Sequence, residues 1–245
     1  MVPTFAFSQT VKEIEYKVGD LTLKSKLVLP KKIGKKKLPV VVLFPEWTGA
    51  GEFLLNKARE VADLGYVALA ADLYGNGKVV TDDKTASQLA GELKAGNRAE
   101  LKRRVKAGIE AAKTQKEVDA DKVVAIGFCF GGTSVLEHVR SGEALSGAVS
   151  FHGNLDTPNP GTKFNTKLLI LHGAMDPFVK KEDIQKFRDE LNKAQADYQW
   201  IEYSGAVHSF TNPKAGSDTS KGAAYNEVAA RRSWEHFKDF LKEVF

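Results

Sequence analysis

Short uninterrupted runs of apolar residues, separated by helical patterns, constrain the fold of this chain more than any other feature. The runs occupy residues 40–44, 67–71, 123–126, 147–151 and 168–171, with a further strand candidate at 198–203. Such runs are typical of strands that are buried on both faces of a parallel sheet. Helical periodicity fills residues 52–64, 98–114, 131–140, 181–195 and 227–244. The alternation predicts crossover connections and a doubly wound α/β sheet.

The N-terminal part of the chain follows a different pattern. Segments 10–18 and 21–29 alternate polar and apolar residues on either side of Gly19-Asp20, which predicts an antiparallel hairpin. The count reaches about eight strands, and the sequence contains no repeat, low-complexity tract or linker. We therefore expect a single domain over residues 1–245, with a mostly parallel sheet and an N-terminal antiparallel hairpin.

Composition narrows the setting in which the protein works. The charged fraction is 27% and the net charge is +5, with Lys and Glu interleaved along most of the chain. The one dense basic run, residues 31–37, could bind an anionic surface, but it lacks interleaved aromatic residues and is interpreted as a solvated loop. We expect no nucleic-acid partner.

Targeting and redox features are equally plain. The single cysteine cannot form an internal disulfide. Residues 1–7 lack the pattern of a signal peptide, and no apolar run approaches the ~20 residues of a membrane span. These features predict a cytoplasmic protein without a membrane segment, and the oligomeric state stays open.

The sharpest chemical signal is the segment 127–132, Gly-Phe-Cys-Phe-Gly-Gly. It follows an apolar strand and precedes a helical pattern, which is the setting of a nucleophile elbow with Cys129 in the place of the usual serine. Gly127 and Gly131 satisfy the need for small residues two positions before and after the nucleophile. A helix N-terminus also favours a thiolate. The alternative is that Cys129 is a small buried apolar residue.

A thiol nucleophile needs a base, and the base needs an acid that orients it. In α/β-hydrolases the chain order is nucleophile, acid, histidine. Asp176 lies in the loop after the strand at 168–171, and His208 lies in the loop after the strand at 198–203. The sequence therefore predicts a triad of Cys129, Asp176 and His208.

The remaining candidate features are weaker. His138 and His236 fall in helical patterns and are interpreted as surface or packing residues, whereas His152 and His172 lie near strand ends and could line the cleft. No cluster has metal-ligand spacing, and no glycine-rich phosphate loop is left unexplained, so no cofactor or metal is expected. Residues 73–97 and 205–226 fit neither a strand nor a long helix, and we expect them to form lid or binding loops.

Four motifs resemble the dienelactone hydrolase family. They are the elbow at 127–132, His-Gly-x-x-Asp-Pro-Phe-Val at 172–179, Gly-x-x-His-Ser-Phe at 205–210 and Pro-Glu-Trp at 45–47. The likeness covers nearly the whole chain. It implies an α/β-hydrolase fold, the same triad, and hydrolysis of a small-molecule ester or lactone through a thiol ester.

The resemblance also implies roles for residues outside the triad. Glu46 corresponds to the glutamate that holds the resting thiol until substrate displaces it. The backbone N–H groups of Phe130 and Trp47 would form the oxyanion hole. Independently of the resemblance, aromatic side chains near these motifs could supply apolar walls for a substrate, although each could equally belong to the core: Trp47, Tyr74, Phe128, Phe130 and Phe210.

One position departs from the family pattern. Members that act on dienelactone carry an arginine four residues after the catalytic histidine, where this chain has Asn212. The second carboxylate-binding arginine has no clear match in residues 73–97, although Lys78, Arg98 or Lys214 could substitute. A lactone that bears a carboxylate is therefore in question. Two rival readings stay open: a non-catalytic binding or interaction protein of this fold, and a redox-responsive thiol.

Overall fold

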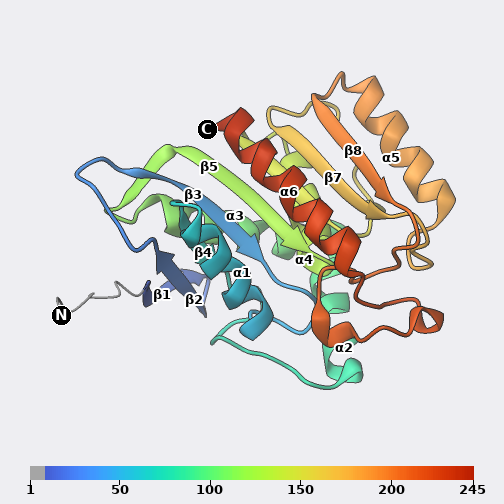
Figure 1. The fold of residues 1–245 in the computed structure, drawn as a ribbon, viewed down its shortest axis with the longest axis horizontal. Helices are drawn as coiled ribbons and strands as arrows, with labels where there is room; N and C mark the ends of the chain where they lie inside the picture. The colour runs from blue at the N-terminus through green and yellow to red at the C-terminus, as the bar shows by residue number, and fades with distance from the viewer. Residues whose placement is uncertain (1–8) are drawn as a thin grey trace, which may run out of the picture.

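The computed structural model describes residues 9–245, and all eight strands in that range join one sheet (Figure 1). The strand order is β1-β2-β4-β3-β5-β6-β7-β8. Residues 1–7, on which the expected absence of a signal peptide rests, lie outside the described range. The sheet confirms the predicted α/β-hydrolase architecture.

The hairpin and the parallel strands occupy the predicted positions. β1 (Thr10–Val18) pairs antiparallel with β2, and β2 pairs antiparallel with β4; every other neighbouring pair is parallel. The remaining strands are β2 (Leu21–Leu29), β3 (Leu38–Phe44), β4 (Val67–Ala70), β5 (Val118–Phe128), β6 (Gly147–Phe151), β7 (Lys167–Gly173) and β8 (Tyr198–Tyr203). The basic run at 31–37 is an exposed loop between β2 and β3.

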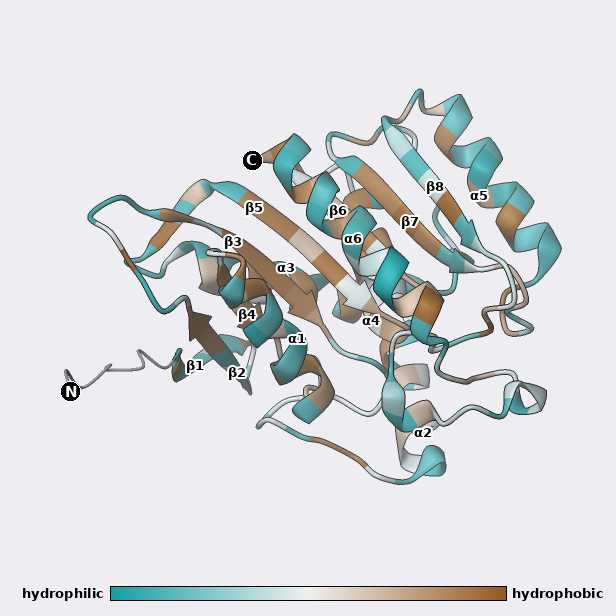
Figure 2. Cartoon of the chain, in the orientation of Figure 1, coloured by the Kyte–Doolittle hydropathy of each residue, from teal (hydrophilic) through white to brown (hydrophobic). Residues whose placement is uncertain are grey.

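Helices cover both faces of the sheet, and each face has its own apolar core. On one face α1 (Glu52–Asp63) and α6 (Glu227–Val244) pack with Phe128, Phe151 and Phe237. The other face is covered by α2 (Asp83–Lys94), α3 (Ala99–Lys113), α4 (Phe130–Arg140) and α5 (Lys181–Lys193). The strands carry the strongest hydropathy and the helices are polar toward solvent (Figure 2), which is the pattern that a three-layer fold requires. No helix among residues 9–245 is long and apolar enough to cross a membrane.

Of the two segments predicted to be loops, the first contains a helix and the second is mostly irregular. Residues 83–94 of the first form α2, where Ala86, Ala90 and Leu93 recur at helical spacing and are buried. The helix begins at Asp82, whose side chain accepts a hydrogen bond from the N–H of Thr85. The expectation of an irregular loop was therefore wrong for this half of the segment. Residues 205–226 contain only the short turns η2 (Pro213–Ala215) and η3 (Thr219–Lys221).

Parallel neighbours bring distant parts of the sequence to one edge of the sheet. β3, β5 and β6 are adjacent, as are β6, β7 and β8. In such a sheet the carboxyl ends of the strands lie at the same edge, which is where open α/β sheets bind ligands. The segments that follow β3, β5, β6, β7 and β8 all begin at this edge.

Candidate active site

Cys129 lies between β5 and α4 with φ 53° and ψ −116°. A positive φ is strained for a residue with a side chain, and such strain concentrates at functional sites. The turn is tight: a Cβ on Gly127 would lie 2.0 Å from the carbonyl oxygen of Gly131, and one on Gly131 would lie 2.2 Å from that of Phe44. Only glycine fits at both positions, and the close approach brings α4 against the end of β3.

His208 connects the Cys129 thiol to Asp176. Its Nε2 lies 3.1 Å from the Cys129 Sγ, and its Nδ1 lies 2.7 Å from Asp176 Oδ2. The other Asp176 oxygen accepts the N–H of Phe178 at 2.9 Å, so the carboxylate is oriented from two sides. The structure thus brings together the three residues that the sequence selected.

The electrostatics of this cluster favour a protonated His208. Burial lowers the pKa of His208, but the negative charge of the Cys129 sulfur and the hydrogen bonds to Asp176 and Cys129 outweigh it and raise the pKa to about 10. A protonated His208 donates a hydrogen bond from Nε2 toward the Cys129 sulfur at this distance.

Glu46 does not hold the thiol, in contrast to the expected resting arrangement. Its Oε2 accepts a hydrogen bond from Asn212 Nδ2 at 2.6 Å, and its Oε1 accepts one from Ser209 Oγ at 3.4 Å. No hydrogen bond joins Glu46 to Cys129 in the described part of the chain. The carboxyl group is buried, which raises its pKa, and the Asn212 hydrogen bond acts in the opposite direction. Asn212 and Ser209 therefore fix the carboxylate that was expected to bind sulfur.

The two amides expected to form an oxyanion hole lie on segments that flank the thiol. The N–H of Phe130 is the first of α4 and has no acceptor within the helix, because the first turn of any helix leaves its N–H groups free. Trp47 follows β3, and its carbonyl accepts a hydrogen bond from the Tyr74 hydroxyl at 2.6 Å. Tyr74 also stacks on Phe130 with ring centroids 6.2 Å apart. Tyr74 thus touches both segments.

Phe210 belongs to the core and does not form an apolar wall of the substrate site. Its side chain is fully buried in the core on the α1 and α6 face, where it contacts the rings of His152 and Tyr203. A side chain with no exposed surface packs the loop and cannot line a cleft. Asn212, which stands where family members that act on dienelactone carry a substrate-binding arginine, donates a hydrogen bond from its amide to Glu46.

Sequence comparison assigns the family. The sequence model of the dienelactone hydrolase family matches residues 23–245. The chain belongs to the dienelactone hydrolase family. It is therefore a hydrolase of the class that acts on esters and lactones.

Individual relatives of the family span most of the chain. A solved dienelactone hydrolase-like promiscuous phosphotriesterase from metagenomic libraries is 36% identical with a TM-score of 0.90, covering 97% of this chain and 99% of its own. A probable 2-oxo-3-(5-oxofuran-2-ylidene)propanoate lactonase of a Bradyrhizobium species is 24% identical over 84% of each chain. An uncharacterized protein of Caenorhabditis elegans is 34% identical over 59% of this chain and 94% of its own.

Two residues near the dienelactone hydrolase motifs contribute more than the sequence suggested. Phe178 is 53% exposed, and its ring meets His208 edge-on at 5.4 Å. His152, expected at the cleft, is completely buried and contacts Cys129 and Thr211. Phe178 could have been found from its place two residues after Asp176, whereas His152 required the strand order.

Two of the three possible substitutes for the missing family arginine bind other groups. Arg98 is buried and binds the carboxylates of Glu137 and Asp156. Lys214 reaches Glu52, and Lys78 is exposed. Among residues 9–245 no group of three His, Cys, Asp or Glu side chains could hold a metal ion.

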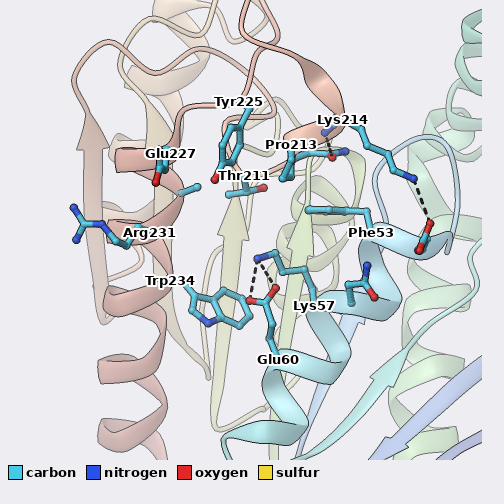
Figure 3. Close-up of a pocket in the computed structure, with 14 residues that line it drawn as sticks. Phe53, Lys57, Glu60, Thr211, Pro213, Lys214, Tyr225, Glu227, Arg231 and Trp234 are labelled. Carbon is cyan, nitrogen blue, oxygen red and sulfur yellow. Dashed lines mark hydrogen bonds and ion pairs between the residues drawn. The ribbon is translucent and has the colours of Figure 1, made fainter.

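A cavity of about 500 Å³ opens between α1 and α6, below the segment 211–214 (Figure 3). Phe53 and Trp234 flank it from the two helices, and Lys57 lies over the Trp234 ring while it pairs with Glu60. Cys129 does not line this cavity. Thr211, on its wall, separates it from His152, so we place the chemistry at Cys129 and not in the cavity.

Proposed function

We propose that the protein hydrolyses small carboxylic esters or lactones through a thiol ester on Cys129, with His208 as acid and base and Asp176 as its orienting group. The observation that carries this proposal is the continuous chain of contacts from Asp176 through His208 to the sulfur, at 2.7 and 3.1 Å. Cys129 lies at the N-terminus of α4, where the helix dipole favours negative charge on the sulfur.

The first half of the reaction transfers the acyl group to sulfur. The Cys129 thiolate attacks the carbonyl carbon, a C–S bond forms, and the carbonyl π electrons move onto oxygen. When this intermediate collapses, the C–O bond to the leaving group breaks and His208 gives its Nε2 proton to the departing alkoxide. In a lactone, the released hydroxyl stays attached to the acyl group.

The second half regenerates the enzyme. Neutral His208 takes a proton from water, and the resulting hydroxide attacks the thiol ester. The C–S bond breaks, the carboxylic acid leaves, and the electron pair returns to sulfur beside the imidazolium. Asp176 keeps Nε2 directed at the sulfur in both halves because it holds Nδ1.

The oxyanion intermediates need two donors close to the sulfur. The N–H groups of Phe130 and Trp47 fill this role in the proposal, since the first belongs to the helix that Cys129 begins and the second follows the neighbouring strand. The Tyr74 hydrogen bond to the Trp47 carbonyl supports that peptide. Removing one such donor in a hydrolase costs about 3 kcal/mol of transition-state stabilisation.

The charge of the site favours a neutral substrate over one with a carboxylate. Glu46 places a carboxyl group beside the reacting residues, and Asn212 contributes a neutral amide where family members that act on dienelactone carry an arginine. An anionic substrate would gain no counterion from the neutral amide of Asn212, and the carboxyl group of Glu46 cannot supply one in either protonation state.

A hydrolysis panel tests the proposal. Wild type and Cys129→Ala are compared on p-nitrophenyl acetate, a neutral enol lactone, dienelactone and diethyl p-nitrophenyl phosphate, the last because of the likeness to a phosphotriesterase. We expect Cys129→Ala to lose about 10⁴-fold in kcat/KM, and mass spectrometry to detect an acyl adduct on wild type alone. Ester turnover that survives in Cys129→Ala would overturn the mechanism. Wild type inert on all four would favour the non-catalytic binding protein.

Three broader expectations accompany this function. We propose that residues 1–245 act as one catalytic domain and work in the cytoplasm without a nucleic-acid partner. Fractionation and a nucleic-acid shift assay would test the last two.

A further inference from the structure

His152 links the nucleophile to the loop that carries the base. It is the first residue after β6, and Phe151 pairs with Phe128, the residue before Cys129. This register places His152 beside Cys129. The Cys129 N–H donates to His152 Nδ1 at 3.1 Å and to the Phe151 carbonyl at 3.0 Å. His152 itself has φ 42°, a left-handed conformation that few side chains adopt.

The other ring nitrogen reaches the histidine loop. His152 Nε2 lies 2.7 Å from the hydroxyl of Thr211, three residues after His208. Because Nδ1 accepts a proton donor, a neutral ring carries its own proton on Nε2, which then donates to Thr211. One side chain thus joins the strained turn at Cys129 to the segment that supplies His208.

The surroundings of His152 suit a neutral ring. Its side chain is completely buried, and burial together with the charge of His208 and, to a smaller extent, His172 lowers its pKa well below the ordinary value. Its ring packs against those of His208 and Phe210 at 5.3 and 5.1 Å. A charged ring would lose the Nδ1 acceptor and repel the imidazolium.

We propose that His152 is a positioning residue that holds Cys129 and His208 in register through its hydrogen bonds to the Cys129 amide and the Thr211 hydroxyl. The inference rests on the proposed function, since it assigns a purpose to the distance between sulfur and Nε2. Loss of either hydrogen bond lets the two loops separate, which weakens the thiolate–imidazolium pair without removing either partner.

Two variants cut the same link from opposite ends. His152→Asn keeps a hydrogen-bond acceptor near the Cys129 amide and tolerates a positive φ, but it is too short to reach Thr211. Thr211→Val has the shape of threonine and lacks the hydroxyl, so it tests the link even where His152→Asn fails to fold. His138→Gln removes another buried imidazole, in α4, that contacts neither Cys129 nor His208 and serves as the control.

The main measurement is the rate at which iodoacetamide alkylates Cys129 between pH 5 and 10. We expect His152→Asn to slow alkylation about 10-fold at pH 7 and to move its midpoint to higher pH, and Thr211→Val to act about 5-fold in the same direction. The double variant should be slowed about as much as His152→Asn alone, and not by the product of the two effects, because both changes remove one link. His138→Gln should react as wild type does.

Two results would overturn the inference: unchanged alkylation profiles in both single variants, or losses that multiply in the double variant. Alkylation needs no ester, so this comparison holds even if wild type fails the hydrolysis panel, and the two proposals can fail separately. Where esters are hydrolysed, kcat should fall with alkylation while KM stays within about twofold, which a general loss of stability would not produce.

Discussion

The two ends of α4 hold buried ionisable groups that are arranged in opposite ways. At the C-terminal end, Arg140 donates from Nε and Nη2 to the two oxygens of Glu190 at 2.8 and 2.9 Å, and from Nη1 to Glu137 at 3.0 Å. Glu190 also accepts the N–H of Gly161 at 2.6 Å, and Glu137 accepts from Arg98 at 3.3 Å. At the N-terminal end, the sulfur of Cys129 has one side-chain partner, His208.

The difference separates a cluster that maintains structure from a pair that can react. In the Arg140 cluster each charge is matched by several charge-assisted hydrogen bonds, which is how buried ions remain stable in a protein. Cys129 is partly exposed, its backbone is strained, and its one hydrogen bond to His208 leaves sulfur electron pairs free. We infer that the Arg140 cluster stabilises the position of α4, whereas Cys129 and His208 at its N-terminus carry the reactivity.

His208→Gln should abolish most of the activity without destabilising the fold, and it should have the largest effect of the three substitutions. The amide cannot accept and return the proton, so kcat/KM should fall about 10⁴-fold, equivalent to about 5.5 kcal/mol. The melting temperature should move by less than about 5 °C. Ester kinetics and differential scanning calorimetry measure the two quantities. A large loss of stability with a modest loss of activity would show that His208 maintains structure and would contradict its assignment to the reactive pair.

Glu190→Gln should destabilise the fold at the Arg140 cluster and leave the reaction intact. It leaves the Arg140 charge buried without its main partner, and the free energy of unfolding should fall by about 4 kcal/mol in urea titration. The folded fraction should retain its kcat/KM. Glu243→Gln is the matched control, because Glu243 pairs with Lys167 at the surface with its side chain 41% exposed, and should change stability by less than about 1 kcal/mol. Equal effects at both positions would contradict the assignment.

His138, which lies in α4 between Cys129 and Arg140, should contribute a smaller change in the free energy of unfolding, and this change should depend on pH. Burial lowers the pKa of His138 to about 4, with nearby Glu143 acting against it and Lys106 and Lys113 adding to it. Between pH 6.5 and 4 the unfolded chain therefore binds a proton that the folded chain does not, and stability falls as the pH falls. This loss should reach about 3 kcal/mol at pH 4. Urea titrations should show it in wild type and not in His138→Gln; parallel curves would contradict it.

The sequence predicted the features that depend on local pattern. Apolar runs located the parallel strands, and the small residues Gly127 and Gly131 located the turn. Gly127 is required by a contact within the turn, with Gly131, whereas Gly131 is required by the close approach of Phe44 at the end of β3. The chain order of an α/β-hydrolase then selected Asp176 and His208. The helix at 83–94 was also within reach, since Asp82 is a typical N-cap residue.

Features that depend on which strands are neighbours could not be read from the sequence. The contact between His152 and Cys129 follows from the register of β5 and β6, and the burial of Phe210 follows from how its loop packs over the sheet. The partner of Glu46 was mispredicted for a similar reason. Several polar groups follow the strands at this edge of the sheet. Glu46 binds Asn212 and not the thiol because of the folded position of the loop that carries Asn212, which the sequence does not reveal.

The separation of Cys129 and His208 along the chain has a consequence during synthesis. The two residues are 79 positions apart. At ribosomal speeds Cys129 is synthesised about 4–16 s before His208. In the proposed mechanism His208 activates the thiol, so Cys129 would gain its reactivity only after β8, the strand that precedes His208, has docked at the far edge of the sheet. The order of synthesis would then delay thiol chemistry until the sheet has formed.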